Sequence, residues 1–288
     1  MQASFRLRPA TRKFFSMTKS IPPGAFAAVS ASVYRASALT RGPWHPEHQH
    51  AGPPIALVCR AIERAALEHG LTHVSRLTAN LLRPVPIAEL TVDVGTDYVG
   101  RNAGHFSASL SVGDKVVARF TALVQRESAV ELPAALPPDP PGHSPPARPQ
   151  PPETSKPGTF PFAGKHVGYA DLVENRVASG VFFSGPCAIW FRLAHPLVEG
   201  EVPSVYQRVA VAADSGNGIS AVLDFSKYIF VNSDLTINLL RRPRGDWVCL
   251  DARTHLGAEG CGLAASNLFD ADGLIGMASQ SLSIRARD

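Results

Sequence analysis

The sequence predicts an α+β protein made of two tandem copies of one small domain, each a long antiparallel sheet wrapped around one buried helix. Three observations support this prediction. Residues 77–84 (LTANLLRP) return at 235–243 (LTINLLRRP), and a proline-rich stretch lies between the two occurrences. Each copy also holds one apolar helical segment and several segments of alternating polarity. A period this long is too large for a solenoid repeat, so it indicates a duplicated domain.

The spacing of the repeat sets the domain limits. Asp93 and Thr96 are matched by Asp251 and Thr254, 158 positions later. Residues 133–161 carry twelve prolines, and such a segment cannot bury enough apolar surface to offset its ordering entropy. We therefore predict an N-terminal domain at 24–130, a linker at 131–162 and a C-terminal domain at 163–288. Residues 1–23 are interpreted as a disordered leader or an overextended start, because Met17 could equally begin the chain.

In the first copy, a strand is expected at 27–38 and a helix begins at Pro53 and Pro54. The helix runs through apolar residues to Gly70, and its polar residues form only a narrow stripe, which indicates a helix buried on most of its circumference. Segments of alternating polarity follow at 90–94, 106–112 and 117–124.

The second copy repeats this order. Strands are expected at 171–178 and 187–193, a helix at 203–223, and further strands at 227–240, 247–256, 262–269 and 274–285. A sheet wrapped around a single apolar helix is the hotdog arrangement, so the predicted fold class is a double hotdog. We expect the two sheets to pair edge to edge.

Composition argues against several classes of function. The net charge is +4, but five positive charges lie in residues 1–20, which contain no acid, so the rest of the chain is close to neutral. It therefore lacks the basic patch expected of a nucleic-acid-binding protein. No apolar run approaches the roughly 20 residues of a membrane span, and no membrane partner is expected. The cysteines show no CxxC spacing, which favours buried free thiols and a cytoplasmic location; they are Cys59, Cys187, Cys249 and Cys261.

The two copies differ in chemistry at three positions, all in the second copy. Asp214 lies in a helical segment with Gly216 and Gly218, whereas the offset of 158 places its counterpart near Ala56, in an uninterrupted apolar helix. A carboxylate in a largely buried helix needs a partner, and such a break in local pattern indicates a functional or close-packed position. The alternative is that the helix ends there and Asp214 is a solvated cap.

The other two positions are Asn232, whose counterpart is near Val74, and Gln280, whose counterpart is near Thr121. Either residue could also be a polar strand position facing water. Together with Asp214 they predict one polar constellation at the junction of helix and sheet. Asp214 would act as a general base, while Asn232 and Gln280 would hold the attacking water and its developing charge.

Outside the leader and the linker, the chain resembles the double-hotdog acyl-CoA thioesterases of type II and their thioesterase-like relatives. The shared segments are 42–44 (GPW), 49–52 (QHAG), 213–214 (AD), 232–236 (NSDLT), 242–247 (RPRGDW), 272–273 (DG) and 280–282 (QSL). In that family the second hotdog carries an Asp, a Thr or Ser, and a Gln that activate water. Asp214 and Gln280 match the first and last. Asn232 departs from the pattern, because an amide cannot relay a proton as a hydroxyl can.

The resemblance also implies an acyl chain in a tunnel between helix and sheet, with the coenzyme A arm at the surface. Gly216 and Gly218 would allow a thioester to approach the backbone closely. Gln49, His50 and Gly52 are expected at the start of the first helix, where exposed amides could hold a carbonyl oxygen. The histidine-rich loop at 45–50 does not offer the converging ligands that zinc requires, so no metal and no cofactor are predicted.

The sequence therefore predicts an acyl-CoA thioesterase that uses Asp-activated water, with a homo-oligomer made plausible by exposed sheet edges. One alternative is a non-catalytic module that binds acyl groups or other hydrophobic ligands, suggested by Asn232 in place of a hydroxyl residue. An enoyl-CoA hydratase of hotdog fold is less favoured, because no histidine follows a few residues after Asp214.

Overall fold

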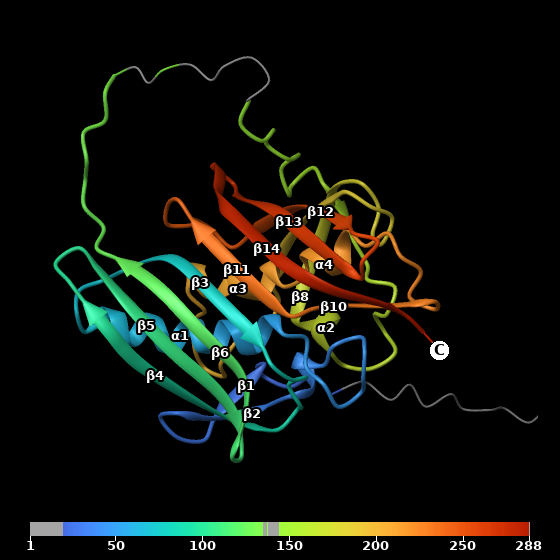
Figure 1. The fold of residues 1–288 in the computed structure, drawn as a ribbon, viewed down its shortest axis with the longest axis horizontal. Coiled ribbons are helices and arrows are strands. Elements are labelled where there is room, and N and C mark those ends of the chain that lie inside the picture. The colour runs from blue at the N-terminus through green and yellow to red at the C-terminus, as the bar shows by residue number, and fades with distance from the viewer. Residues whose placement is uncertain (1–19, 135–136, 138–143, 288) are drawn as a thin grey trace, which may run out of the picture.

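The computed structural model describes residues 20–134, 137 and 144–287, and its two halves share one sheet (Figure 1). The sheet has 14 strands in the order β1-β2-β4-β5-β6-β3-β11-β14-β13-β12-β9-β8-β7, with β10 paired to β14. The strands pair antiparallel, and the sheet curls around the helices α1 and α3, which pack against each other. This is the predicted double hotdog.

The N-terminal half contains one long helix and six strands. They are β1 (Phe26–Ala28), β2 (Val33–Ala36), α1 (Gly52–Leu67), β3 (His73–Leu81), β4 (Glu89–Val99), β5 (Ala103–Val112) and β6 (Lys115–Gln125). The single strand predicted at 27–38 is wrong, because the chain turns back between β1 and β2. The Val29 N–H donates to the Val33 carbonyl at 2.8 Å and closes this turn.

The C-terminal half repeats the plan with more interruptions. Its elements are β7 (Lys156–Pro157), α2 (Tyr169–Leu172), β8 (Val173–Ser179), β9 (Cys187–Leu193), α3 (Val205–Ala213), α4 (Gly216–Ile219), β10 (Tyr228–Asn232), β11 (Asp234–Leu239), β12 (Val248–Leu256), β13 (Cys261–Asp270) and β14 (Gly273–Ala286). The helix predicted at 203–223 is two helices, α3 and α4. The strand predicted at 227–240 is interrupted at Ser233, whose N–H donates to the Ser281 carbonyl at 3.0 Å.

The two halves meet at equivalent strands, β3 and β11. Thr78 lies directly opposite Thr236 in the antiparallel register, and their hydroxyl oxygens are 3.3 Å apart. These two residues are related by the offset of 158 that defines the duplication. The halves are therefore arranged about a local two-fold axis, and the expected edge-to-edge pairing of the sheets is confirmed.

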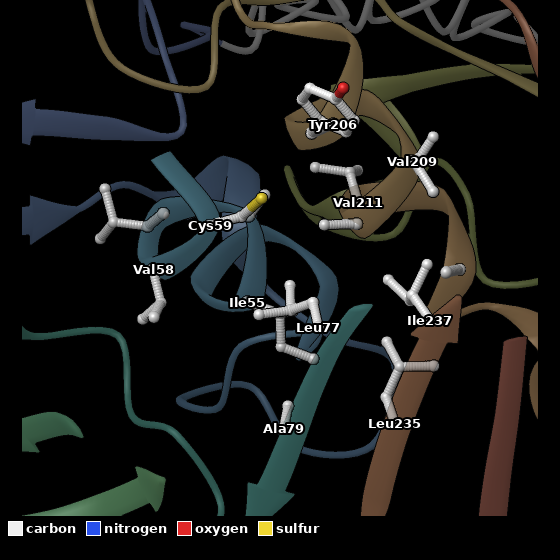
Figure 2. Close-up of a cluster of buried hydrophobic side chains, with 14 of the residues drawn as sticks. Ile55, Val58, Cys59, Leu77, Ala79, Tyr206, Val209, Val211, Leu235 and Ile237 are labelled. Atoms are coloured by element: carbon white, nitrogen blue, oxygen red, sulfur yellow. The ribbon is translucent and has the colours of Figure 1, made fainter. Parts of the chain in front are cut away.

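The core lies between the helices and the concave face of the sheet. Figure 2 shows apolar side chains from α1, α3, β3 and β11 packed there. Gly52 lets α1 approach α3, because a Cβ at this position would lie 2.5 Å from the Val211 carbonyl oxygen. The buried Arg60 of α1 reaches across the halves, where its Nε donates to Glu201 Oε2 at 2.6 Å.

Part of the predicted linker packs on the C-terminal half. Lys156 and Pro157 pair with β8, Phe160 is buried, and the Trp190 indole donates to the Gln150 carbonyl at 2.7 Å. The segment 150–162 therefore contributes to that half, and the domain limits of 24–130 and 163–288 stay a prediction. The predicted leader falls almost wholly on residues 1–19, which lie outside the described residues.

All four cysteines are free, but Cys261 is exposed at the start of β13, whereas burial was expected for the whole set. Within the described part of the chain, none of the helices combines the length and apolar character needed to cross a bilayer.

Candidate active site

The break between α3 and α4 places Asp214 at the end of one helix and just before the next. Ser215 N–H donates to the Ala212 carbonyl at 2.9 Å, which tightens the last turn before the chain continues into α4. Gly216 faces the sheet, because a Cβ there would lie 2.8 Å from Ser266 Oγ and 3.1 Å from Gln280 Oε1. The glycine thus lets α4 approach β13 and β14, and this approach brings the Asp214 backbone within reach of Gln280.

The three residues predicted to be catalytic converge in the structure. Asn232 Nδ2 donates to Asp214 Oδ1 at 3.0 Å. Gln280 Nε2 lies 3.1 Å from the Asp214 carbonyl oxygen and 3.3 Å from Asp214 Oδ1, and Gln280 Oε1 accepts from the Asn217 N–H at 2.8 Å. Only 4% of the Asp214 side chain is exposed, so the alternative of a solvated cap is wrong.

The remaining carboxylate oxygen of Asp214 faces a residue of the other half. His50 Nδ1 lies 3.0 Å from Asp214 Oδ2, and 12% of the imidazole side chain is exposed. The sequence placed His50 in the loop before the first helix but did not connect it with Asp214. The pair joins the two domains at the polar constellation.

One face of the His50 imidazole packs against an aromatic ring. The imidazole stacks on Tyr169, with centroids 3.7 Å apart and planes 3° from parallel. The Tyr169 hydroxyl donates to the Val211 carbonyl at 3.0 Å and lies 2.9 Å from Ser215 Oγ. Burial raises the pKa of Tyr169, so this hydroxyl stays protonated at neutral pH. Tyr169 therefore fixes the ring against the α3–α4 break.

Burial lowers the pKa of His50, and the nearby Asp214 carboxylate offsets only part of this effect. The ring is therefore neutral at pH 7, with one nitrogen protonated. Asp214 Oδ2 lies 3.0 Å from Nδ1, and the Gly52 N–H points at the same nitrogen from 3.2 Å. Only one of these contacts can be a hydrogen bond, because a protonated Nδ1 cannot accept from Gly52. A buried carboxylate facing a nitrogen lone pair would be strongly unfavourable, so we assign the proton to Nδ1, which donates to Asp214. Nε2 then carries the free lone pair.

The first turn of α1 has fewer amides for a carbonyl oxygen than expected from the sequence, and the proposed role of this helix start stays a prediction. Pro53 and Pro54 occupy the first turn and have no N–H, and the Gly52 N–H lies against His50 Nδ1. The two prolines already indicate this in the sequence, because proline lacks the N–H donor that such a site needs.

A cavity of ≈ 750 Å³ opens beside the constellation. Asp214 and Asn232 line it, together with three of the residues predicted to bind substrate, which are Gln49, His50 and Gly218. The other two, Gly52 and Gly216, do not line it and instead allow close packing of α1 on α3 and of α4 on the sheet. Gln280 also lies behind the cavity, so it positions Asp214 rather than facing a ligand.

Two carboxamides beside the cavity keep an acceptor without a partner. Gln49 Nε2 donates to the Pro86 carbonyl at 2.7 Å, and Asn217 Nδ2 lies 3.4 Å from the Phe230 carbonyl. Among the described residues, neither Gln49 Oε1 nor Asn217 Oδ1 has a hydrogen-bond partner. An unpaired buried acceptor is unfavourable and indicates a place for water.

Cations from separate segments line the same cavity. They are Arg83, Lys165 and Arg287, whereas the only acidic residue of the lining is the buried Asp214. Within the described chain, Arg83 and Lys165 have no acidic partner. In that same part of the chain, no group of three or more His, Cys, Asp or Glu residues is arranged to hold a metal ion.

Comparison with known proteins agrees with this architecture. The family model of acyl-CoA thioesterase C-terminal domains matches residues 137–284, and that of acyl-CoA thioesterase N-terminal domains matches residues 40–125. No curated protein matches the chain in sequence.

Solved structures with the same fold include three with high coverage. A proposed thioesterase II from Thermobifida fusca has a TM-score of 0.68 at 15% identity, covering 92% of this chain and 96% of its own. A conserved hot dog protein from Alicyclobacillus acidocaldarius has a TM-score of 0.65 at 17% identity, with 92% and 97% covered. An acyl-CoA thioesterase II from Mycobacterium marinum has a TM-score of 0.61 at 16% identity, with 91% and 95% covered.

Proposed function

Because the chain belongs to the acyl-CoA thioesterase family and is a thioester hydrolase, we propose that it cleaves acyl-CoA with a water molecule activated by the Asp214–His50 pair. The single observation that carries this mechanism is the 3.0 Å contact between His50 Nδ1 and Asp214 Oδ2 beside a cavity. It supplies an oriented base in a family whose reaction needs one.

The two ring nitrogens of His50 have different tasks in the proposed proton transfer. His50 Nε2 takes a proton from the cavity water while Nδ1–H donates to Asp214, which stabilises the imidazolium that forms. The hydroxide adds to the thioester carbonyl carbon. When the tetrahedral intermediate collapses, the carbon–sulfur bond breaks and the imidazolium returns its proton to the thiolate. The products are a carboxylic acid and free coenzyme A.

This scheme assigns the relay to His50 and leaves Asn232 a different task. The Asn232 amide N–H donates to Asp214, so its Oδ1 is available to accept a hydrogen bond from the attacking water. No proton passes through this position, which removes the difficulty posed by an amide where the resembled family has a hydroxyl. Gln280 acts through Asp214 and is a positioning residue.

Coenzyme A as the carrier is supported by the charges around the cavity. Arg83, Lys165 and Arg287 give the lining a positive potential suited to the phosphates of the carrier. Another arginine group, at 241–244, is less suited because its members are already ion-paired: Arg241 with Asp270, Arg242 with Glu127 and Arg244 with Asp272.

The cysteines and the sheet edges bear on location and assembly. Four free cysteines are typical of a reducing compartment, so we place the protein in the cytoplasm. The sheet ends in the short strands β1 and β7, and β1 already bonds to the segment 196–199, so the predicted homo-oligomer would have to use another surface.

The test is thiol release from a panel of acyl-CoAs by the wild type and by Asp214→Asn. We expect wild-type turnover and a loss of roughly 10²–10⁴-fold in the variant, because general-base catalysis contributes on that order. His105→Gln serves as the control and should keep wild-type activity. His105 is exposed on β5, and no residue of this strand lines the cavity. Binding of acyl-CoA with no thiol released by the wild type would contradict the proposal and favour the non-catalytic binding module.

A further inference from the structure

Six aromatic residues line the active-site cavity, alongside aliphatic side chains such as Leu81, Leu82 and Ile219. This aromatic lining consists of Trp44, Phe160, Phe162, Tyr169, Phe183 and Phe225. None of these residues belongs to a repeated strand or to the two long helices: they come from the loop before α1, the end of the predicted linker, α2 and two loops of the C-terminal half. The duplication supplies the scaffold, and the unrepeated segments supply the rings.

Some rings of the aromatic lining contact one another and reach the His50 imidazole. Phe160 lies against Phe162, with centroids 4.9 Å apart, and against Tyr169 at 6.1 Å. Tyr169 in turn stacks on His50. A group bound among these rings therefore lies beside the imidazole that activates the water, where the acyl part of a thioester must be.

The rest of the aromatic lining is held by the chain that follows α4. Phe225 lies 5.2 Å from Trp44 and 5.1 Å from Phe183, the latter in an edge-to-face arrangement. The Phe183 N–H donates to the Ile219 carbonyl at 3.1 Å, at the end of α4. Of the described non-glycine residues, Phe183 alone has a positive φ, 58°. A bulky residue persists in this region only when its surroundings hold it there, and such positions gather at ligand sites.

The space between the two long helices and the sheet is filled, so an acyl group must lie within the ≈ 750 Å³ cavity beside the reaction centre. The void between the helices and the sheet measures ≈ 10 Å³ and is enclosed by Cys59, Val74, Leu77, Tyr206, Val209, Ile237 and Leu239. This is about enough for one water molecule. Figure 2 shows Cys59 from α1, Leu77 from β3 and Ile237 from β11 in this packed region. The tunnel between helix and sheet that the resemblance implies is closed at this point.

We infer that the preferred substrate carries a compact acyl group with an aromatic ring rather than a long unbranched chain, an inference that rests on the function proposed above. A flat ring can pack against the faces and edges of the aromatic lining, and such contacts add to the burial of apolar surface. The packed core next to α1 and α3 closes the way between helix and sheet, so a long chain would have to fold within the aromatic-lined cavity. The coenzyme A arm would then meet Arg83, Lys165 and Arg287, which also line the cavity.

The experiment compares kcat/KM for phenylacetyl-CoA, hexanoyl-CoA and palmitoyl-CoA. We expect phenylacetyl-CoA to exceed palmitoyl-CoA by at least about tenfold, with hexanoyl-CoA between them. Phe162→Leu and Phe225→Leu keep an apolar side chain but remove the ring, so they should reduce the preference for phenylacetyl-CoA over hexanoyl-CoA. Tyr98→Leu, at an exposed position on β4, is the matched control and should leave the preference unchanged.

The outcomes separate this inference from the proposed function. Thiol release that is fastest with palmitoyl-CoA, or a preference that survives both leucine variants, would overturn the inference while the thioesterase stands. If no thioester is hydrolysed, the proposed function fails. Calorimetric affinities for the same three acyl-CoAs then still test the inferred acyl preference. Tighter binding of phenylacetyl-CoA would support the inference, and equal or tighter binding of palmitoyl-CoA would contradict it.

Discussion

The helix α1 and its counterpart, the α3–α4 pair, occupy equivalent places in the two copies and differ in what they contribute to the proposed site. α1 is an unbroken helix of 16 residues, and the position equivalent to Asp214 falls near Ala56, which is fully buried in its apolar face. The second copy breaks at Asp214, whose carboxylate three polar side chains surround. A duplicated fold can thus keep one helix as core and use the other for chemistry.

The comparison also shows why the chain has one constellation rather than two. The offset of 158 pairs His50 with Arg208, and Arg208 is committed to Asp246 at 3.2 Å. The site related by the local two-fold axis would therefore combine Ala56, Val74 and an arginine, which supply neither an acid nor a base. Each copy gives one member of the Asp214–His50 pair, so the site depends on the docking of the two halves.

The largest loss of activity is expected from a substitution of His50, the contribution of the first copy to the site. His50→Gln should lower kcat/KM by roughly 10²–10⁴-fold, because the proton acceptor is lost while the shape of the side chain is approximately kept. A pH profile adds a second readout. Because burial lowers the pKa of His50, the neutral base persists below pH 6.5, and wild-type activity should fall only as the pH decreases further. A wild-type acid limb centred above pH 6.5, or an unchanged limb in His50→Gln, would count against this role.

A moderate effect is expected where the two helices touch. Gly52→Ala places a Cβ 2.5 Å from the Val211 carbonyl oxygen and must push α1 from α3. We expect a loss of about 1–3 kcal/mol in the free energy of unfolding, measured by denaturant titration. Gly218→Ala is the matched control, because nothing lies within 4 Å of its Cβ position, and it should leave stability unchanged or slightly raised. Equal stabilities of the two variants would show that α1 and α3 are not closely packed at Gly52.

The smallest effect is expected at Asn232. Asn232→Thr restores a hydroxyl of the type that the resembled family carries, and it exchanges one neutral hydrogen-bonding group for another. If His50 performs the relay, kcat/KM should change by no more than about tenfold in either direction. A gain of several orders of magnitude would mean that the hydroxyl is the missing relay, and the role of His50 would need to be reassigned.

The sequence predicted the scaffold and half of the pair. The repeat placed Thr78 and Thr236 at equivalent positions, and the structure puts them opposite each other. Asp214 and Asn232 were identifiable because each is polar where the first copy is apolar, and Gln280 because the first copy has a threonine in place of the amide. Comparison within the chain is informative here because copies that share a fold should share their buried pattern.

The remaining features depend on tertiary contacts that no sequence period encodes. His50 was placed correctly in its loop, but its contact with Asp214 forms only when α1 packs on α3. Tyr169 received no role from the sequence, since a single helical turn at 169–172 is too short to show a period. Phe160 lies in a segment whose prolines indicated a linker, although its ring is buried. Composition described that segment locally and missed what it packs against.

The central claim, that Asp214 and His50 act as one unit across the two halves, is tested most directly by a double-mutant cycle. Thiol release is measured for the wild type, Asp214→Asn, His50→Gln and the double variant. Denaturant titration verifies that each variant unfolds in the same cooperative transition as the wild type. A single proton-transfer unit predicts that the double variant loses little more activity than the more damaging single variant. Losses that multiply, or full activity in His50→Gln, would contradict the claim.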